Sequence, residues 1–202
     1  MRLVFVRESD LAHLGDAMTT AIFSDGNPIT EAEFRAIGET PERIELFDGS
    51  LHVTPAPTPL HQIISHRLGR AMDAGADEAD LLVLETVNVR LTPSRIPIPD
   101  LVISSSEIDL SELIIDASSI RLVCEILSPS NASTDRVLKM HYYATGGIPW
   151  YLLVDPSAHT LHLYRLVGET YVLESVTEDG GVLKLTDPIV ATLDPAELLP
   201  RV

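Results

Sequence analysis

The stretch RLVCEILSPSNASTDRVLKMHYYATGGIPWYLLVDP, residues 121–156, is the part of the sequence that decides the fold. It opens with an apolar run that is typical of a buried strand and contains one acidic residue, Glu125. A polar turn follows, then a segment with helical spacing that ends at two glycines, and then a second apolar run, WYLLVDP. A strand, a helix and another strand in this order predict an α/β unit. Because an ionised group is rarely buried in an apolar strand without a partner, Glu125 marks a candidate site.

The sequence before this unit predicts a second long helix and a hairpin. Residues 57–76 predict a helix with one buried face, because apolar residues recur there at helical spacing: Leu60, Ile63, Ile64, Leu68 and Met72. Upstream, RIELFDGSLHV at residues 43–53 predicts two short strands around an Asp-Gly turn. Before it, Thr30 and Glu33 form a capping-box pattern that predicts a short helix ending at Gly38.

Short apolar runs predict the strands of one sheet, at residues 81–91, 98–104, 120–127 and 150–156. Further runs at 160–166, 170–176 and 181–185 predict a C-terminal β-meander. The predicted fold is therefore α/β (α+β), a mixed β-sheet flanked by helices. We expect residues 29–202 to form a single domain, with residues 1–28 as a peripheral N-terminal segment.

Composition limits the classes of function. The 202 residues are 45% hydrophobic and 22% charged, as in an ordinary globular protein. With 30 acidic and 14 basic residues the net charge is −16, so the chain as a whole repels polyanions. We find no P-loop, no dinucleotide-binding glycine motif and no zinc-finger spacing, and the single cysteine, Cys124, is interpreted as a buried apolar residue. Without an apolar run of about 18 residues or a signal peptide, we expect a cytoplasmic protein with no membrane contact.

Two carboxylates are the first candidates for chemistry. Asp100 follows Pro99 at the start of one predicted strand, and Glu125 lies deep in the next long one. If these strands are neighbours in register, both side chains can point to the same side of the sheet. Two buried carboxylates cannot both stay ionised at close range without a cation. An oxygen-rich site of this kind suits Mg²⁺ or Mn²⁺.

The helix within residues 121–156 supplies a cationic partner. Asp135, Lys139 and Tyr143 are four residues apart and share a stripe, so Lys139 could lie over the carboxylates. Carboxylates, a metal ion and a lysine together form a set suited to phosphodiester cleavage. Each residue also has a simpler interpretation: Asp135 and Lys139 as an exposed helix pair, and Tyr143 as core. His61 can also be interpreted as a surface residue, and Glu45 can be interpreted as a solvated strand residue.

In combination, these residues resemble the Uma2 family, also called DUF820, of the PD-(D/E)XK nuclease superfamily. The resemblance covers roughly residues 30 to 190. It is carried by Glu45, Asp48-Gly49, His61, the Pro-Asp pair at 99–100, CEILSPS at 124–130 and DRVLKMHYYATGGIPWYLLVDP at 135–156. One departure concerns Trp150, which stands where the family commonly has an acidic residue.

The resemblance implies a restriction-endonuclease-like core in which Asp100 and Glu125 hold Mg²⁺ or Mn²⁺. The superfamily's usual lysine position, two residues after the glutamate, is Leu127 here, and Lys139 fits a relocated lysine on the following helix. Glu45 matches an acidic residue near the metal, and His61 matches a family position without an assigned role. With Asp135 and Tyr143, these two are candidate accessory residues.

The resemblance implies a Mg-dependent endonuclease that hydrolyses phosphodiester bonds of nucleic acid. The acidic charge is the main objection, so a small basic strip around Arg90, Arg95 and Arg136 or a partner would have to meet the backbone. Two alternatives stay open: an inactive nuclease-fold module that binds proteins or regulates, and a hydrolase of small phosphodiesters. A homodimer is left open as well.

Overall fold

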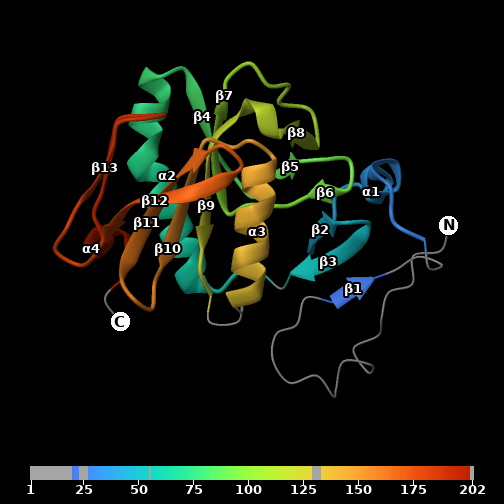
Figure 1. Cartoon of the computed structure of the whole chain (residues 1–202), viewed down its shortest axis with the longest axis horizontal. Coiled ribbons are helices and arrows are strands. Elements are labelled where there is room, and N and C mark those ends of the chain that lie inside the picture. Colours follow the sequence, from blue (N-terminus) through green and yellow to red (C-terminus); the bar gives the residue numbers. More distant parts are fainter. Residues whose placement is uncertain (1–19, 23–26, 55, 129–132, 201–202) are drawn as a thin grey trace.

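The computed structural model describes residues 20–22, 27–54, 56–128 and 133–200, and gives only the backbone of 20–22 and 133–136. Its main body is a six-stranded sheet with the strand order β12-β11-β10-β9-β7-β4 (Figure 1). These strands are β4 (Leu81–Glu85), β7 (Leu101–Ser105), β9 (Ile120–Ile126), β10 (Trp150–Asp155), β11 (Thr160–Val167) and β12 (Thr170–Thr177). The predicted fold class, a mixed sheet flanked by helices, is confirmed.

The quoted stretch forms the centre of this sheet. Strands β9 and β10 are parallel neighbours, and helix α3 (Ser133–Thr145) makes the crossover between them. Every other neighbouring pair in this sheet is antiparallel. A parallel pair needs a crossover of this length, whereas β10, β11 and β12 follow each other through short turns as the predicted meander. The α/β unit predicted from residues 121–156 is therefore present.

The two long helices lie on opposite faces of the six-stranded sheet (Figure 1). Helix α2 (Pro59–Glu78) buries Ile64, Leu68 and Met72 against one face. Helix α3 buries Tyr143 against the other face, in a cluster that includes Val102 of β7 and Val123 of β9. Because side chains alternate along a strand, the residues two positions from these valines also face α3.

A smaller four-stranded sheet, in the order β1-β3-β2-β6, lies beside the main sheet (Figure 1). Its strands are β1 (Thr20–Ile22), β2 (Arg43–Phe47), β3 (Ser50–Thr54) and β6 (Arg95–Ile96). Asp48 and Gly49 join β2 to β3 with φ values of 50° and 82°. Two positive φ values identify the tight hairpin turn that Asp-Gly favours, so the predicted hairpin is confirmed.

Short elements complete the fold. The capping box of Thr30 and Glu33 starts helix α1 (Glu31–Ile37), and Gly38 ends it, as predicted. Two further strand pairs and two short helices follow: β5 (Asn88–Arg90) with β8 (Ile114–Asp116), β13 (Leu183–Leu185) with β14 (Ala191–Leu193), the 3₁₀ helix η2 (Ala117–Ser119) and helix α4 (Pro195–Leu198).

Three local predictions were wrong. Residues 81–91 form two strands instead of one, because Thr86 adopts a φ of 55° and turns the chain between β4 and β5. Strand β13 pairs with β14 and does not extend the meander. Leu60 and Ile63, assigned to the buried face of α2, are 39% and 42% exposed, whereas Ile64, next to Ile63, is fully buried.

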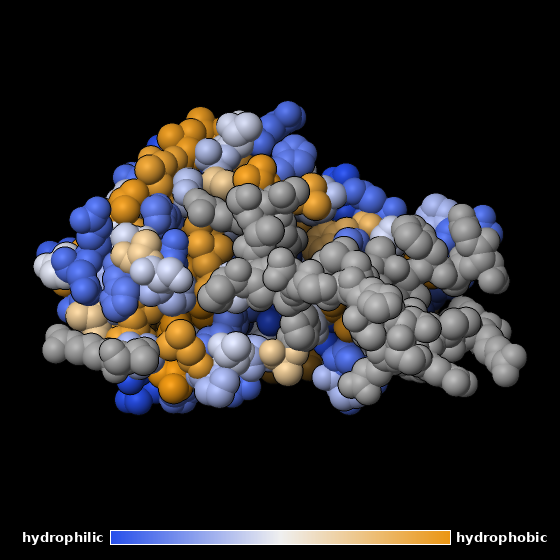
Figure 2. Space-filling model, turned by 90° about the horizontal axis from the view of Figure 1, so that it is seen from below, coloured by the Kyte–Doolittle hydropathy of each residue, from blue (hydrophilic) through white to orange (hydrophobic). Residues whose placement is uncertain are grey.

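The described surface contains both hydrophobic and hydrophilic residues. Seen from below the view of Figure 1, hydrophobic residues reach the surface in separate groups among hydrophilic ones (Figure 2). Within the described residues, no helix is long and apolar enough to cross a membrane.

Candidate active site

Asp100 and Glu125 face each other across two antiparallel strands. Val102 of β7 is paired with Val123 of β9, so two residues further along this register Asp100 lies opposite Glu125. Both valines pack on the α3 side of the sheet, and so both carboxylates lie on that side. The two acidic residues are nearly buried, with 4% and 9% of their surfaces exposed. The two acidic residues, which are separated in the sequence by about a strand and a turn, therefore lie opposite each other in the sheet.

Helix α3 places an amine and a phenol over Glu125. Lys139 Nζ lies 3.5 Å from Glu125 Oε1 and 3.1 Å from Oε1 of Glu45, which β2 contributes. The Tyr143 hydroxyl, one helical turn after Lys139, donates a hydrogen bond of 2.5 Å to Glu125 Oε1. Glu45 is buried as well, and its Oε1 also accepts the backbone N–H of Ile98 at 2.9 Å. Lys139 therefore bridges carboxylates from two different sheets.

Asp100 is held by groups from three other elements. Its Oδ1 lies 3.1 Å from Nη1 of Arg43, and its Oδ2 lies 3.1 Å from Nε2 of His61 at the start of α2. Oδ2 also accepts the backbone N–H of Ile126 at 2.8 Å. The second guanidinium nitrogen of Arg43 donates to the carbonyl oxygen of Ile98 at 2.6 Å. These contacts fix the carboxylate beside Glu125.

Burial and contacts shift the two facing carboxyls in opposite directions. Burial alone would raise the pKa of Asp100, but the contacts with His61, Arg43 and the Ile126 N–H outweigh it and lower the pKa to about 2. Burial raises the pKa of Glu125 to about 7, and the charge of Lys139 opposes this only in part. Glu125 therefore keeps a proton close to neutral pH, because burial disfavours its charged form.

The donor set fits a hard divalent cation. Mg²⁺ typically takes one or two carboxylates and completes its shell with water and phosphate oxygens, and Asp100 and Glu125 supply such a pair. Burial raises the pKa of Glu125, and a bound cation would favour its ionised form. Among the described residues, however, no three His, Cys, Asp or Glu side chains come together as a metal site. A metal here would therefore depend on the two facing carboxylates.

The structure brings together most of the residues predicted from the sequence. Asp100, Glu125, Lys139, Glu45, His61 and Tyr143 form one cluster. The simpler interpretation of Lys139 as part of an exposed helix pair is wrong, because its side chain is only 11% exposed. His61 is likewise no surface residue, at 14%. The side chain of Asp135 lies outside the described residues.

Arg43 is the residue that the sequence analysis missed. It precedes Glu45 by two positions in β2 and therefore points to the same side of the strand. Burial opposes its charge, but the surrounding carboxylates outweigh burial and raise its pKa above the ordinary value. A period-two reading of RIELF outward from Glu45 would have found it.

The expected basic strip is neutralised where the structure describes it. Arg90 makes two contacts of 2.8 Å with Asp116 and a third of 2.8 Å with Glu31. Arg95 pairs with Asp48 at 2.7 Å. The side chain of Arg136 lies outside the described residues, so two of the three strip arginines are already paired with carboxylates.

The comparison with protein families identifies a family for this chain. The sequence model of Uma2, described as "Putative restriction endonuclease", matches residues 31–196. The chain belongs to the Uma2 family. The resemblance stated from the sequence is confirmed, and every residue of the cluster, from Arg43 to Tyr143, lies within the matched part of this Uma2 chain.

Solved structures support the fold of this Uma2 protein. A crystal structure of "a putative nuclease belonging to DUF820" from Anabaena variabilis is similar with a TM-score of 0.71 and 18% identity, over 85% of this chain and 97% of that one. A cryo-electron microscopy structure of the DrdV–DNA complex gives a TM-score of 0.32 and 14% identity, over 58% of this chain and 12% of that one. The second likeness is too weak to support an argument. No curated protein matches the chain.

Proposed function

We propose that the protein is a metal-dependent nuclease that hydrolyses phosphodiester bonds of nucleic acid. The observation that carries this proposal is the opposition of Asp100 and Glu125 with the Lys139 amine 3.5 Å from Glu125. Membership of a family described as restriction endonucleases supports the nuclease class. Phosphodiester hydrolysis requires a charged, preorganised site, and this cluster is the most highly charged buried region among the described residues.

In this proposal Asp100 and Glu125 hold Mg²⁺ or Mn²⁺. The bound ion would supply Lewis acidity to the phosphoryl group and make water a stronger nucleophile at neutral pH. Lys139 would orient the nucleophile and stabilise negative charge that develops on the phosphoryl oxygens. Its ammonium group is fixed for this by Glu45, 3.1 Å away.

The remaining residues of the cluster would act by positioning. Tyr143 donates to Glu125 Oε1 and so fixes the orientation of that carboxylate. His61 and the Ile126 N–H hold Asp100 Oδ2, and Arg43 holds Oδ1. These contacts restrain both carboxylates before any ligand arrives, which lowers the reorganisation needed for reaction.

A hydrolase of small phosphodiesters is the second candidate. The ion pairs of Arg90 and Arg95 favour this candidate. An arginine that is already paired with a carboxylate contributes little to the binding of a long polyanion. A nuclease that relies on few backbone contacts would share the same site. Cleavage of plasmid DNA, single-stranded DNA and RNA should therefore be compared with hydrolysis of dinucleotides and cyclic nucleotides.

The experiment that tests the proposal measures metal binding and cleavage on the same variants. Calorimetry with Mg²⁺ and Mn²⁺ is expected to show binding to the wild type that is lost in Asp100→Ala. Cleavage should require the metal and stop in EDTA. Binding that is insensitive to this substitution, with no cleavage of any substrate, would instead support a regulatory or protein-binding module.

A further inference from the structure

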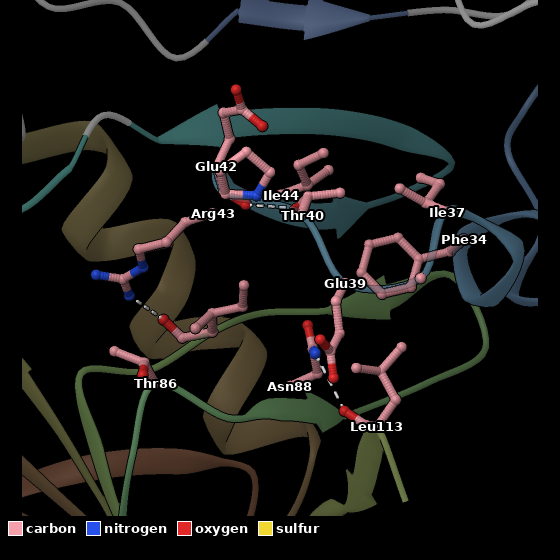
Figure 3. Close-up of a pocket in the computed structure, with 13 residues that line it drawn as sticks. Phe34, Ile37, Glu39, Thr40, Glu42, Arg43, Ile44, Thr86, Asn88 and Leu113 are labelled. Carbon is pink, nitrogen blue, oxygen red and sulfur yellow. Dashed lines mark hydrogen bonds between the residues drawn. The ribbon is translucent and has the colours of Figure 1, made fainter.

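A pocket of about 370 Å³ lies next to the candidate active site (Figure 3). This volume falls within the range of about 300 to 1,000 Å³ that is usual for small-molecule sites. Its lining comes from α1, from the segment after it, from β2, from residues between β4 and β7, and from Leu113 just before β8. The contacts described for the carboxylates do not account for this pocket.

The pocket shares a wall with the active site. Three of its lining residues contact Asp100 or Glu45, two of them through the side-chain carboxylate and Thr86 through the backbone of Asp100. The N–H of Thr86 donates to the carbonyl oxygen of Asp100 at 3.3 Å, and Arg43 Nη1 lies 3.1 Å from Asp100 Oδ1. The N–H of Ile98 donates to Glu45 Oε1 at 2.9 Å. A ligand in the pocket is therefore one residue away from the groups proposed to cleave.

Arg43 makes one end of the pocket suited to an anion. Its side chain is 18% exposed, and Nη1 and Nη2 donate to Asp100 Oδ1 and to the Ile98 carbonyl oxygen. Each of these nitrogens carries a second N–H that a ligand oxygen could accept. Guanidinium groups bind phosphate strongly because charge and geometry match. Arg43 is the lining residue with that chemistry.

The opposite end offers hydrogen-bond acceptors. Figure 3 shows Glu39 and Asn88 next to each other, on the far side of the pocket from the Arg43 guanidinium. The Asn88 amide nitrogen uses one of its two N–H groups on the Leu113 carbonyl oxygen at 3.1 Å, and the amide oxygen is an acceptor. A carboxylate and an amide oxygen together select a ligand that presents several N–H donors.

Apolar side chains line the space between the two ends. Phe34, Ile37, Ile44 and Ile98 belong to this lining, and Phe34 and Ile98 are buried. Flat, apolar ligand surfaces gain by leaving water for such walls. The ligand that fits all three parts has a phosphate at one end, a flat ring in the middle and N–H donors at the other end.

We propose that this pocket binds a guanine nucleotide unit of an unpaired strand, with its phosphate on Arg43 and its N–H donors on Glu39 and Asn88. Guanine presents adjacent donors on N1 and N2, which match a carboxylate, whereas uracil and thymine offer a single N–H. Those guanine donors are used in base pairs, so the base must be unpaired. The inference rests on the proposed nuclease function and names its substrate. Recognition through the base also accounts for binding by a chain of net charge −16.

The test measures nucleotide binding in EDTA, where no cleavage occurs. NMR titrations of the full chain would use GMP, AMP, CMP, UMP and ribose 5-phosphate. GMP is expected to bind at least about tenfold more tightly than UMP or ribose 5-phosphate, the ratio that about 1.4 kcal/mol of hydrogen bonding provides. Glu39→Gln should weaken GMP binding about tenfold and leave ribose 5-phosphate unaffected.

Glu107→Gln is the matched control, since it removes the same charge from an exposed position outside the pocket lining. GMP binding should not change in this variant. Equal affinities for all four nucleotides, no saturable binding, or equal losses in both variants would overturn the inference. Specific GMP binding without metal-dependent cleavage would support the guanine pocket and refute the nuclease proposal. Metal-dependent cleavage without base preference would support the nuclease proposal and refute the guanine pocket.

Discussion

Asp100 lies directly opposite Glu125 on the same side of the sheet, yet the first carboxyl has its pKa lowered to about 2 and the second has its pKa raised to about 7. The difference comes from their neighbours. Asp100 contacts His61, Arg43 and a backbone N–H. Glu125 is buried, and the Lys139 charge and the Tyr143 hydrogen bond only partly oppose its desolvation. The pair therefore combines a permanently charged carboxylate with one that changes charge near neutrality.

The raised pKa of Glu125 predicts a loss of stability with rising pH. A carboxyl whose pKa rises from 4.5 to about 7 on folding stabilises the native state below pH 4.5, and this contribution is lost as pH passes 7. In metal-free buffer, Glu125→Gln should therefore gain about 2 kcal/mol in unfolding free energy relative to the wild type between pH 5 and pH 8. Urea unfolding at each pH measures this difference in unfolding free energy, and Glu107→Gln, at an exposed position, is the control. A difference that is constant with pH would contradict the prediction.

Metal binding should reverse that loss. A divalent ion that binds the native state at 100 times its Kd stabilises it by about 2.7 kcal/mol. Because the ion competes with the proton on Glu125, stabilisation by Mg²⁺ should be larger at pH 8 than at pH 6. Thermal unfolding with Mg²⁺ and with EDTA measures the effect. It should vanish in Asp100→Asn and persist in Asp73→Asn, a matched change on the exposed face of α2; equal effects in both variants would rule out the proposed ligands.

Substitution of Lys139 should affect turnover more than metal binding. Lys139→Met is expected to reduce kcat by about 10²–10³, the range for removal of one preorganised charge, while the affinity for Mn²⁺ changes little. Removing one partner of a buried ion pair also costs about 3–5 kcal/mol, so activity must be compared where circular dichroism shows both proteins folded. Wild-type turnover in the folded variant would exclude a role for the amine in the reaction.

A second contact fixes the helix that carries Lys139. Tyr142 donates to Asp48 Oδ2 at 2.6 Å, Arg95 pairs with Asp48 Oδ1 at 2.7 Å, and the Arg95 guanidinium lies 4.2 Å from the centre of the Tyr142 ring. Tyr142→Phe should reduce the unfolding free energy by about 1.5 kcal/mol, since a hydrogen bond to a charged group is lost. Chemical denaturation measures this loss.

That loss should also depend on pH. The hydrogen bonds from Tyr142 and Arg95 lower the pKa of Asp48 below its ordinary value of 3.8, so their stabilisation is present above pH 3.8 and decreases as the pH falls further. The difference between wild type and Tyr142→Phe should therefore shrink in acid. Tyr171→Phe removes a hydrogen bond to the Ile148 carbonyl and provides a control that does not titrate there. A Tyr142 effect that persists unchanged at low pH would show that Asp48 is not its source.

Local patterns were enough to predict much of the fold and part of the site. The Asp-Gly hairpin, the capping box of α1, and the strand, helix and strand of residues 121–156 are set by contacts between residues close in the chain. The division into a segment 1–28 and one domain from 29 stays a prediction, as does a homodimer. Where the backbone turned against its local preference, as at Thr86, the prediction failed.

By itself, the sequence determined that a glutamate is placed in a buried strand and that a lysine follows on the next helix, because side-chain period and hydrophobicity are local properties. Tertiary structure decided that two residues of a separate sheet reach the site, Glu45 at Lys139 and Arg43 at Asp100. It also decided that Arg90 and Arg95 are paired with acids. Strand register and the docking of one sheet against another depend on the packing of the whole core. The local sequence around two residues that are far apart in the chain does not indicate that the folded protein brings them into contact.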